Sequence, residues 1–155
     1  MKELRTKQDI FDMPDSRKCA VCVTTNGIVK RNGEAVMGAG VAKVCRDRFP
    51  AVPNILGTWL NAHGNRAYNL GEWGNSCTTF LLFSFPTKHD WRNDSDPELI
   101  RKSCREVKEL CDINDIDKCY LPRPGCTNGH LDYETQVRPI LMEELDDRFI
   151  IILRD

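Results

Sequence analysis

The residues with the clearest chemical potential lie where an apolar run ends in a proline turn. The run covers residues 79–85, and after the proline the chain presents Lys88, His89 and Asp90 in succession. A lysine at a strand end beside a ligand crevice can lose part of its hydration and act as a nucleophile toward an aldehyde-like carbon. Judged on chemistry alone, a solvated lysine is the commoner case, and His89 and Asp90 are ordinary loop residues.

Two glycine-bearing loops offer a different chemistry, the binding of phosphate. Gly38 and Gly40 stand directly before a predicted helix, so backbone N–H groups and the positive end of the helix dipole can face an anion. Residues 122–129 form a second such loop, and two loops together can clamp a diphosphate through backbone donors. A lone G-x-G also occurs in plain strand-to-helix connections. No Walker loop occurs, and Lys43 stands where the dinucleotide fingerprint needs its third glycine.

The elements that must position these loops alternate between short apolar runs and longer helical patterns, which predicts an α/β fold. The predicted strands are residues 20–25, 66–70, 79–85, 118–121 and 148–153, and the predicted helices are residues 40–49, 97–111 and 133–145. Pro139 should kink the last helix or delay its start. Residues 1–18 are charged throughout and are predicted to be a polar lead-in. Ligands of open α/β sheets bind beyond the strand ends.

Composition narrows the class of protein. The 155 residues are 41% hydrophobic and 29% charged, which suits one folded domain over residues 1–155 and argues against disorder. A net charge of −1 leaves no global basic field for gripping nucleic acid, so any such contact must be local. No apolar run approaches the roughly 18 residues of a membrane span. We expect a soluble, cytoplasmic protein without membrane contact.

The eight cysteines are scattered, which favours free thiols over a disulfide framework. Cys19 and Cys22 form a C-x-x-C, but they lie in a predicted strand, where residues three apart point to opposite faces. We therefore do not expect this pair to share a zinc ion. We expect neither a metal nor a cofactor.

Several motifs, taken together, resemble those of one family. Residues 8–10 (Gln-Asp-Ile) resemble a Gly-Asp-Ile start, and residues 23–26 resemble a strand that ends in a ligand-binding asparagine. Residues 36–42 resemble the loop M-G-x-G-[IV]-A, and residues 121–133 are similar to the diphosphate loop P-x-x-G-C-G-x-G-G-L-x-W. This order over nearly the whole chain resembles macrodomains, the ADP-ribose-binding modules. The resemblance implies a three-layer α/β/α fold with a central mixed, mostly parallel sheet.

Residues 85–92 (Phe-Pro-Thr-Lys-His-Asp-Trp-Arg) narrow the resemblance to one branch. It contains the DNA ADP-ribosyl hydrolase antitoxin and the terminal ADP-ribose protein glycohydrolase, both of which carry a lysine here. The resemblance implies that Lys88 is catalytic. It would attack C1'' of the distal ribose, or stabilise the opened sugar, so that ADP-ribose leaves its attachment.

The same resemblance assigns binding roles residue by residue. Asp9 would accept a hydrogen bond from the adenine amino group beside the backbone of Ile10, and Asn26 would hold the distal ribose. Asp9 is equally explained as a turn cap, and an asparagine before glycine is a common turn signal. The remaining residues expected at the diphosphate and distal ribose are Met37, Gly38, Ala39, Gly40, Val41, Ala42, Gly125, Cys126, Thr127, Asn128 and Gly129.

Two positions depart from the family pattern. Thr127 stands where the family usually has glycine, which adds a β-branched side chain at a close-approach position. Gly129 replaces an aspartate that assists the lysine in the protein glycohydrolase, and the antitoxin-like branch lacks that aspartate as well. His130 and Asp132 lie nearby, but structural roles are the better expectation for both. The missing aspartate favours the antitoxin-like branch, whereas Thr127 is expected to weaken or redirect binding.

We therefore expect a lysine-dependent ADP-ribosyl hydrolase that removes ADP-ribose from a modified macromolecule, with DNA slightly favoured over protein glutamate or aspartate. The alternatives are a phosphatase acting on ADP-ribose 1''-phosphate and a reader that binds ADP-ribose without turnover. The expected partners are ADP-ribose or ADP-ribosylated DNA or protein, with antagonism of an ADP-ribosyltransferase, and the protein is expected to be a monomer. The cations that could meet a DNA backbone are Arg92, Arg101, Lys102 and Arg105.

Overall fold

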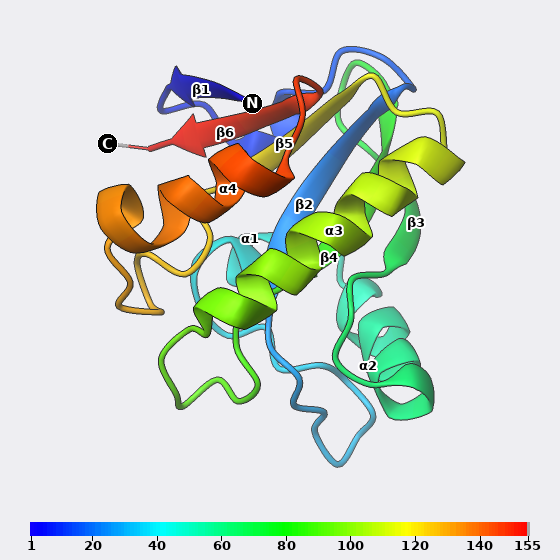
Figure 1. Ribbon diagram of the computed structural model, residues 1–155. Helices are drawn as coiled ribbons and strands as arrows, with labels where there is room; N and C mark the ends of the chain where they lie inside the picture. The colour runs from blue at the N-terminus through cyan, green and yellow to red at the C-terminus, as the bar shows by residue number, and fades with distance from the viewer. Residues whose placement is uncertain (155) are drawn as a thin grey trace.

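A six-stranded mixed sheet forms the centre of the computed structural model, which describes residues 1–154. The strand order is β1-β6-β5-β2-β4-β3, and every neighbouring pair is parallel except β3 with β4 (Figure 1). The mostly parallel sheet is thus confirmed. The strands are β1 (Lys2–Arg5), β2 (Cys19–Thr25), β3 (Asn69–Gly74), β4 (Thr79–Pro86), β5 (Lys118–Pro122) and β6 (Phe149–Leu153).

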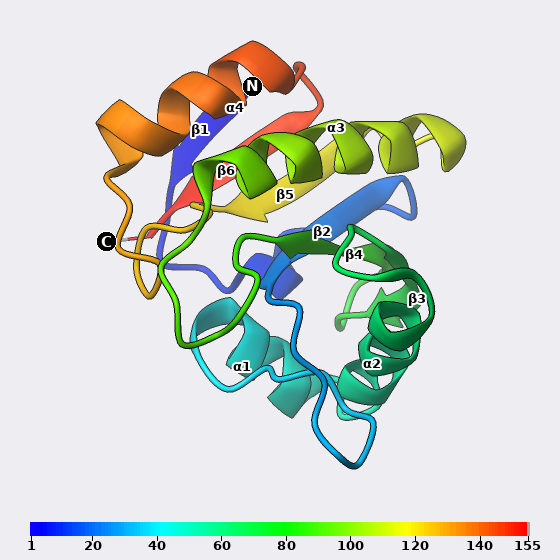
Figure 2. The same cartoon turned by 60° about the horizontal axis from the view of Figure 1, so that its bottom comes forward.

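Helices cover both faces of this sheet, which confirms the three-layer α/β/α arrangement. Figure 2 shows α1 (Gly40–Arg48) and α2 (Val52–His63) on one face, and α3 (Pro97–Ile113) and α4 (Arg138–Glu144) on the other. Each face has its own apolar core. A short 3-10 helix, η1 (Ile10–Asp12), and a π-helical turn, η2 (Tyr133–Val137), complete the elements.

Strand β2 contributes side chains to both apolar cores. Cys19 packs on the face of α1 and α2, whereas Cys22 packs on the face of α3 and α4, because side chains alternate along a strand. The prediction that these two thiols point to opposite faces is confirmed. Within residues 1–154, no group of three or more His, Cys, Asp or Glu side chains is arranged to hold a metal ion.

Helices α3 and α4 begin where the sequence signals place them. Asp96 caps α3 by accepting a hydrogen bond from the Glu98 N–H at 2.9 Å, and Pro97 occupies the first turn. The predicted helix 133–145 opens with the π turn, and its α-helical part starts only at Arg138. Pro139 then falls in a first turn, where its missing N–H costs no hydrogen bond. The late start expected from Pro139 is confirmed.

Two sequence predictions of the sheet were wrong. The strand expected at residues 66–70 is β3, Asn69–Gly74, although the Tyr68 carbonyl still accepts from the Ser84 N–H at 2.9 Å. The polar lead-in contains β1, an edge strand of four exposed residues that pairs with β6. An exposed edge strand buries neither face, so it lacks the apolar alternation that identifies strands in sequence.

Over the part of the chain that the structure describes, no helix is long and apolar enough to cross a membrane.

Candidate functional site

A cavity of about 580 Å³ opens at the carboxyl ends of β2, β4 and β5. Because these strands are parallel neighbours, the loops that follow them meet at one edge of the sheet. The structure thus brings together the three loops that the sequence singled out. The cavity is lined by Thr24, Thr25, Asn26, Val36, Gly38, Ala39, Gly40, Val41, Ala42, Thr87, Lys88, Trp91, Ser95, Pro122, Arg123, Gly125, Cys126, Thr127, Asn128 and Gly129.

One wall is the N-terminus of α1, which lacks a side-chain cap. Ala39 is the N-cap residue and makes no side-chain hydrogen bond to the first turn. The first N–H groups of a helix have no partner within the helix, so those facing this cavity suit an anion. A Cβ added at Gly38 would meet no atom within 4 Å, which leaves open space beside the backbone.

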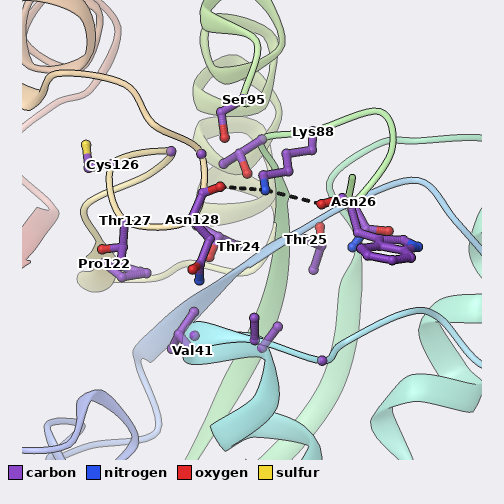
Figure 3. Close-up of a pocket in the computed structure, with 18 of the residues that line it drawn as sticks. Thr24, Thr25, Asn26, Val41, Lys88, Ser95, Pro122, Cys126, Thr127 and Asn128 are labelled. Atoms are coloured by element: carbon purple, nitrogen blue, oxygen red, sulfur yellow. Dashed lines mark hydrogen bonds between the residues drawn. The ribbon is translucent and has the colours of Figure 1, made fainter. Parts of the chain in front are cut away.

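Lys88 lies in the opposite wall and is held by the backbone of two loops. Its Nζ donates to the Asn128 carbonyl at 2.8 Å and to the Trp91 carbonyl at 3.5 Å. Figure 3 shows Lys88 between Asn128 and Asn26. The two carbonyls take two N–H donors of the amine, so its third position remains for a ligand. The predicted catalytic lysine therefore sits in the cavity wall, with its Nζ at a defined position.

The backbone of the Lys88 loop is fixed by its neighbours. Asn65 Nδ2 donates to the Lys88 carbonyl at 3.0 Å, and the Gly27 N–H donates to the His89 carbonyl at 3.2 Å. His89 Nε2 lies 2.8 Å from Asp96 Oδ2, and this hydrogen bond lowers the pKa of the Asp96 carboxyl. Hydrogen bonds on both sides of Lys88 restrict its movement.

The loop after β5 forms the third wall, and its glycines have distinct roles. Gly125 has φ +76°, a conformation that favours glycine. A Cβ added at Gly129 would overlap Ser95 Oγ and lie 2.5 Å from the Gly125 carbonyl oxygen. An aspartate at position 129, as in the protein glycohydrolase, does not fit this loop. Burial raises the pKa of the neighbouring Cys126 thiol to about 11.

Ser95 carries a polar atom without a partner. Its side chain lines the cavity, the residue is 6% exposed, and Oγ makes no hydrogen bond within the described residues. Its N–H donates to the Gly129 carbonyl at 3.0 Å, which ties Ser95 to the loop after β5. Buried hydroxyls are normally hydrogen-bonded, so an unpaired one in a cavity wall suits a ligand or water.

A second cavity of about 370 Å³ continues the first. The two share Gly40, Val41, Pro122, Arg123 and Thr127, so they form one elongated site. The second cavity is further lined by Gln8, Asp9, Ile10, Val44, Ile152 and Arg154. Thr127 lies at the junction, where the family pattern has glycine. The predicted adenine end and the predicted distal ribose end are thus connected.

Asp9 and Asn26 also fill the structural roles that the sequence left open. Asp9 Oδ1 accepts from the Phe11 N–H at 2.9 Å and caps η1. Asn26 Oδ1 accepts from the Ile28 N–H at 3.0 Å, and its Nδ2 donates to the Val36 carbonyl at 3.0 Å. Each side chain lines its cavity and stabilises a turn at the same time.

Other expected positions fall differently. Met37 is 1% exposed and lies in the core of α1 and α2, so it lines neither cavity. His130 Nδ1 contacts Asp94 Oδ1 at 2.8 Å, and the Asp132 side chain accepts from the Thr135 N–H at 2.9 Å to cap η2. The structural roles expected for His130 and Asp132 are what the structure shows.

The cations expected to meet a DNA backbone are paired with carboxylates. Arg101 contacts Glu143 at 2.7 Å, and Arg105 contacts Glu144 at 2.8 Å. Lys102 lies 3.5 Å from a carboxylate one turn along α3. This face of α3 is therefore not a free basic patch.

Sequence reasoning gave no role to several residues at this site, among them Arg123, Ser95 and Asn65. Arg123 lines both cavities and lies over the Tyr133 ring with its guanidinium carbon 5.8 Å from the centroid. Ser95 and Asn65 were missed because their roles depend on contacts between distant segments. Trp91 was considered as a possible lining residue because it stands in the motif that surrounds Lys88, and the structure places it in the cavity wall.

Comparisons with solved structures identify the fold. The macrodomain of Mycobacterium tuberculosis DarG is 20% identical, with a TM-score of 0.72 over 97% of this chain and 96% of that one. The Thermus aquaticus DarG macrodomain is 19% identical, with a TM-score of 0.73 over 99% and 97%. Thermosipho africanus DarTG in complex with ADP-ribose is 24% identical, with a TM-score of 0.75. That match covers 99% of this chain and 42% of the larger protein.

The fold and the site define a class of protein: a three-layer α/β/α domain with a cavity at the carboxyl ends of its central parallel strands. More particularly, the chain has the macrodomain fold, and similarity to DarG macrodomains is consistent with the branch that the motifs resemble. No known family model matches the sequence, and no curated protein matches it.

Proposed function

We propose that this protein binds ADP-ribose and hydrolytically removes it from a modified macromolecule, with Lys88 as the catalytic residue. The observation that carries the proposal is the place of Lys88 Nζ. It lies 2.8 Å from the Asn128 carbonyl, in a cavity whose opposite wall is the uncapped N-terminus of α1. A positively charged or nucleophilic amine and an anion-binding helix end thus share one pocket.

The elongated site supports a ligand of the shape of ADP-ribose. The adenine would lie beside Asp9 and Ile10, and the diphosphate would lie between the α1 N-terminus and the loop after β5. Arg123 lines both cavities, so it would add a positive charge near the diphosphate. The distal ribose would then reach Lys88. The solved complex of DarTG with ADP-ribose, which shares this fold, supports the choice of ligand.

In the chemical step, Lys88 Nζ would attack C1'' of the distal ribose as a neutral amine. A bond forms between Nζ and C1'' while the bond between C1'' and the attached group breaks, and the attached group leaves with that electron pair and takes up the proton that Nζ loses. Water then attacks C1'', the bond to Nζ breaks, and ADP-ribose leaves with the hydroxyl while Nζ regains a proton from that water. The carbonyls of Asn128 and Trp91 would orient Nζ. No carboxylate assists from position 129, because a side chain there would overlap Ser95. The lysine-only arrangement supports the antitoxin-like branch.

The substrate follows from this branch, with ADP-ribosylated DNA slightly favoured over ADP-ribosylated protein. The protein would then antagonise an ADP-ribosyltransferase, act as a monomer and fold as one domain. Eight free cysteines support a reducing, cytoplasmic place of action. A phosphatase for ADP-ribose 1''-phosphate and a non-catalytic reader are the other uses of the same pocket.

A substrate panel separates these functions. The wild-type protein is incubated with ADP-ribosylated single-stranded DNA, ADP-ribosylated protein and ADP-ribose 1''-phosphate, and release of ADP-ribose or phosphate is followed. Calorimetry measures binding of ADP-ribose, ATP and NAD in parallel. We expect release of ADP-ribose from a macromolecule and selective binding of ADP-ribose. Phosphate release alone would select the phosphatase, and binding without turnover would select the reader.

A further inference from the structure

Trp91 is placed unusually for its residue type. It is 52% exposed, although tryptophan is highly buried on average, and it lines the larger cavity. Its carbonyl oxygen lies 3.5 Å from Lys88 Nζ. The exposed indole therefore stands at the mouth of the cavity, on the residue whose backbone carbonyl accepts from the amine that the proposed function makes catalytic.

Arg92 adds a second flat group beside the indole. Its guanidinium carbon lies 5.6 Å from the centroid of the Trp91 ring. Asp90 holds it by two hydrogen bonds, from Nε at 3.0 Å and from Nη2 at 2.6 Å. These bonds lower the pKa of the Asp90 carboxyl to about 2. The loop thus presents a tryptophan and an arginine in a fixed arrangement before any ligand arrives.

The path by which the group on C1'' leaves the cavity decides whether that group contacts Trp91 and Arg92. If the distal ribose lies at Lys88, as the proposed function requires, the group on C1'' leaves the cavity past the loop that carries Trp91. We propose that Trp91 and Arg92 form the subsite for this attached group and stack on it when it is a nucleobase of single-stranded nucleic acid, the substrate that the proposed function favours. Aromatic and guanidinium planes stack on any base, whereas an aspartyl or glutamyl ester offers no ring to stack on.

The same structure limits how far recognition extends along the strand. The chain carries a net charge of −1, and the cations of α3 are paired with carboxylates. Arg92 itself is neutralised by Asp90. Because the cations of α3 and Arg92 are paired in this way, phosphates that pass along this side of the site beyond the modified nucleotide gain little binding energy. Recognition therefore ends at the modified base, and a short oligonucleotide is as good a substrate as a long one.

The test compares two exposed tryptophans. Trp91→Ala removes the proposed subsite, and Trp59→Ala is the matched control, because Trp59 is 41% exposed on α2 and lines neither cavity. Each variant is assayed for kcat/KM on an ADP-ribosylated single-stranded oligonucleotide, for kcat/KM on an ADP-ribosylated glutamate peptide, and for Kd of free ADP-ribose. Thermal unfolding checks that both variants fold.

We expect Trp91→Ala to lower kcat/KM on the oligonucleotide by about tenfold to a hundredfold, the measured range for losing one stacked base. The Kd of free ADP-ribose should change by less than about threefold, since that ligand carries no base beyond C1''. Trp91→Phe should recover most of the loss. Turnover of trinucleotide and long substrates should agree, and kcat/KM should fall less than about tenfold between roughly 50 and 200 mM salt.

Three results would overturn the subsite. They are an equal loss of free ADP-ribose binding, an equal loss on the glutamate peptide, and a steep salt dependence with strong preference for long strands. The first would place Trp91 in the ADP-ribose site itself. Failure of the proposed function has a different signature, because the wild-type protein would then neither bind ADP-ribose nor release it from any substrate.

Discussion

Two glycines in the walls of the cavity should respond in opposite ways to the same added methyl group. A Cβ at Gly129 would overlap Ser95 Oγ and lie 2.5 Å from the Gly125 carbonyl oxygen and 2.7 Å from Ser95 Cβ. A Cβ at Gly38 would meet no atom within 4 Å. The first substitution therefore tests packing of the free protein, and the second tests whether the cavity is filled by ligand.

For Gly129→Ala the loop must move away from Ser95, at an overpacking cost of about 1–3 kcal/mol. For a chain of 155 residues, this corresponds to a Tm lowered by about 2–12 °C. Gly38→Ala should change the Tm of the free protein by less than about 2 °C, as expected for a site without new contacts. If ADP-ribose fills the space beside Gly38, the same overpacking cost falls on the complex and raises Kd by about fivefold to a hundredfold.

Differential scanning fluorimetry and calorimetry with ADP-ribose measure both quantities. The double variant Gly129→Ala with Ser95→Gly is the control, since it removes two of the atoms that the added methyl would meet and should recover part of the Tm. Equal Tm losses for the two single variants would refute the packing argument. Unchanged ADP-ribose affinity in Gly38→Ala would refute the assignment of this wall to the ligand.

Other consequences follow from single contacts. Ser95→Ala removes an unpaired hydroxyl, so the free protein should keep its Tm while the Kd of ADP-ribose rises about threefold to tenfold. Ser103→Ala is the comparison, because it removes a hydroxyl that donates a hydrogen bond to the Pro86 carbonyl at 2.6 Å. It should lower the Tm and leave the Kd of ADP-ribose unchanged. Asn65→Ala frees the Lys88 carbonyl and should lower kcat about tenfold with little change in KM, as steady-state kinetics would show. The pKa of Glu144 is lowered from 4.5, chiefly by its hydrogen bond from Arg105. Its stabilisation is therefore complete above that value and is lost as the pH falls through the lower folded pKa, so urea unfolding between about pH 6 and pH 3 should show a drop that Glu144→Gln flattens.

The sequence predicts the layers of this fold because buried elements carry periodic apolar residues. Strands β2 and β4 are buried on both faces, and α3 has one apolar stripe, so all three were predicted close to their bounds. Strand β1 is exposed, and β3 carries Glu72 and two glycines, so neither shows a period of two. Helix α2 was not predicted as a separate helix, because residues 52–63 follow α1 after a short turn and continue its apolar pattern.

For the site, the sequence predicts which loops meet but not the contacts between them. Lys88, Gly40 and Asn128 were assigned from motifs, and the structure gathers them around one cavity. Met37 lines neither cavity, because its apolar side chain is buried in the core on the face of α1 and α2. The contact between Gly129 and Ser95 joins segments 34 positions apart, and no local pattern reveals such a contact.

The central claim is that Lys88 carries out the release of ADP-ribose. The most direct measurement is single-turnover release from ADP-ribosylated single-stranded DNA by wild type and by Lys88→Ala, with the Kd of ADP-ribose determined for both. The account predicts that the variant still binds ADP-ribose while its rate of release falls by at least about a hundredfold. Release at the wild-type rate from the folded variant would contradict the account.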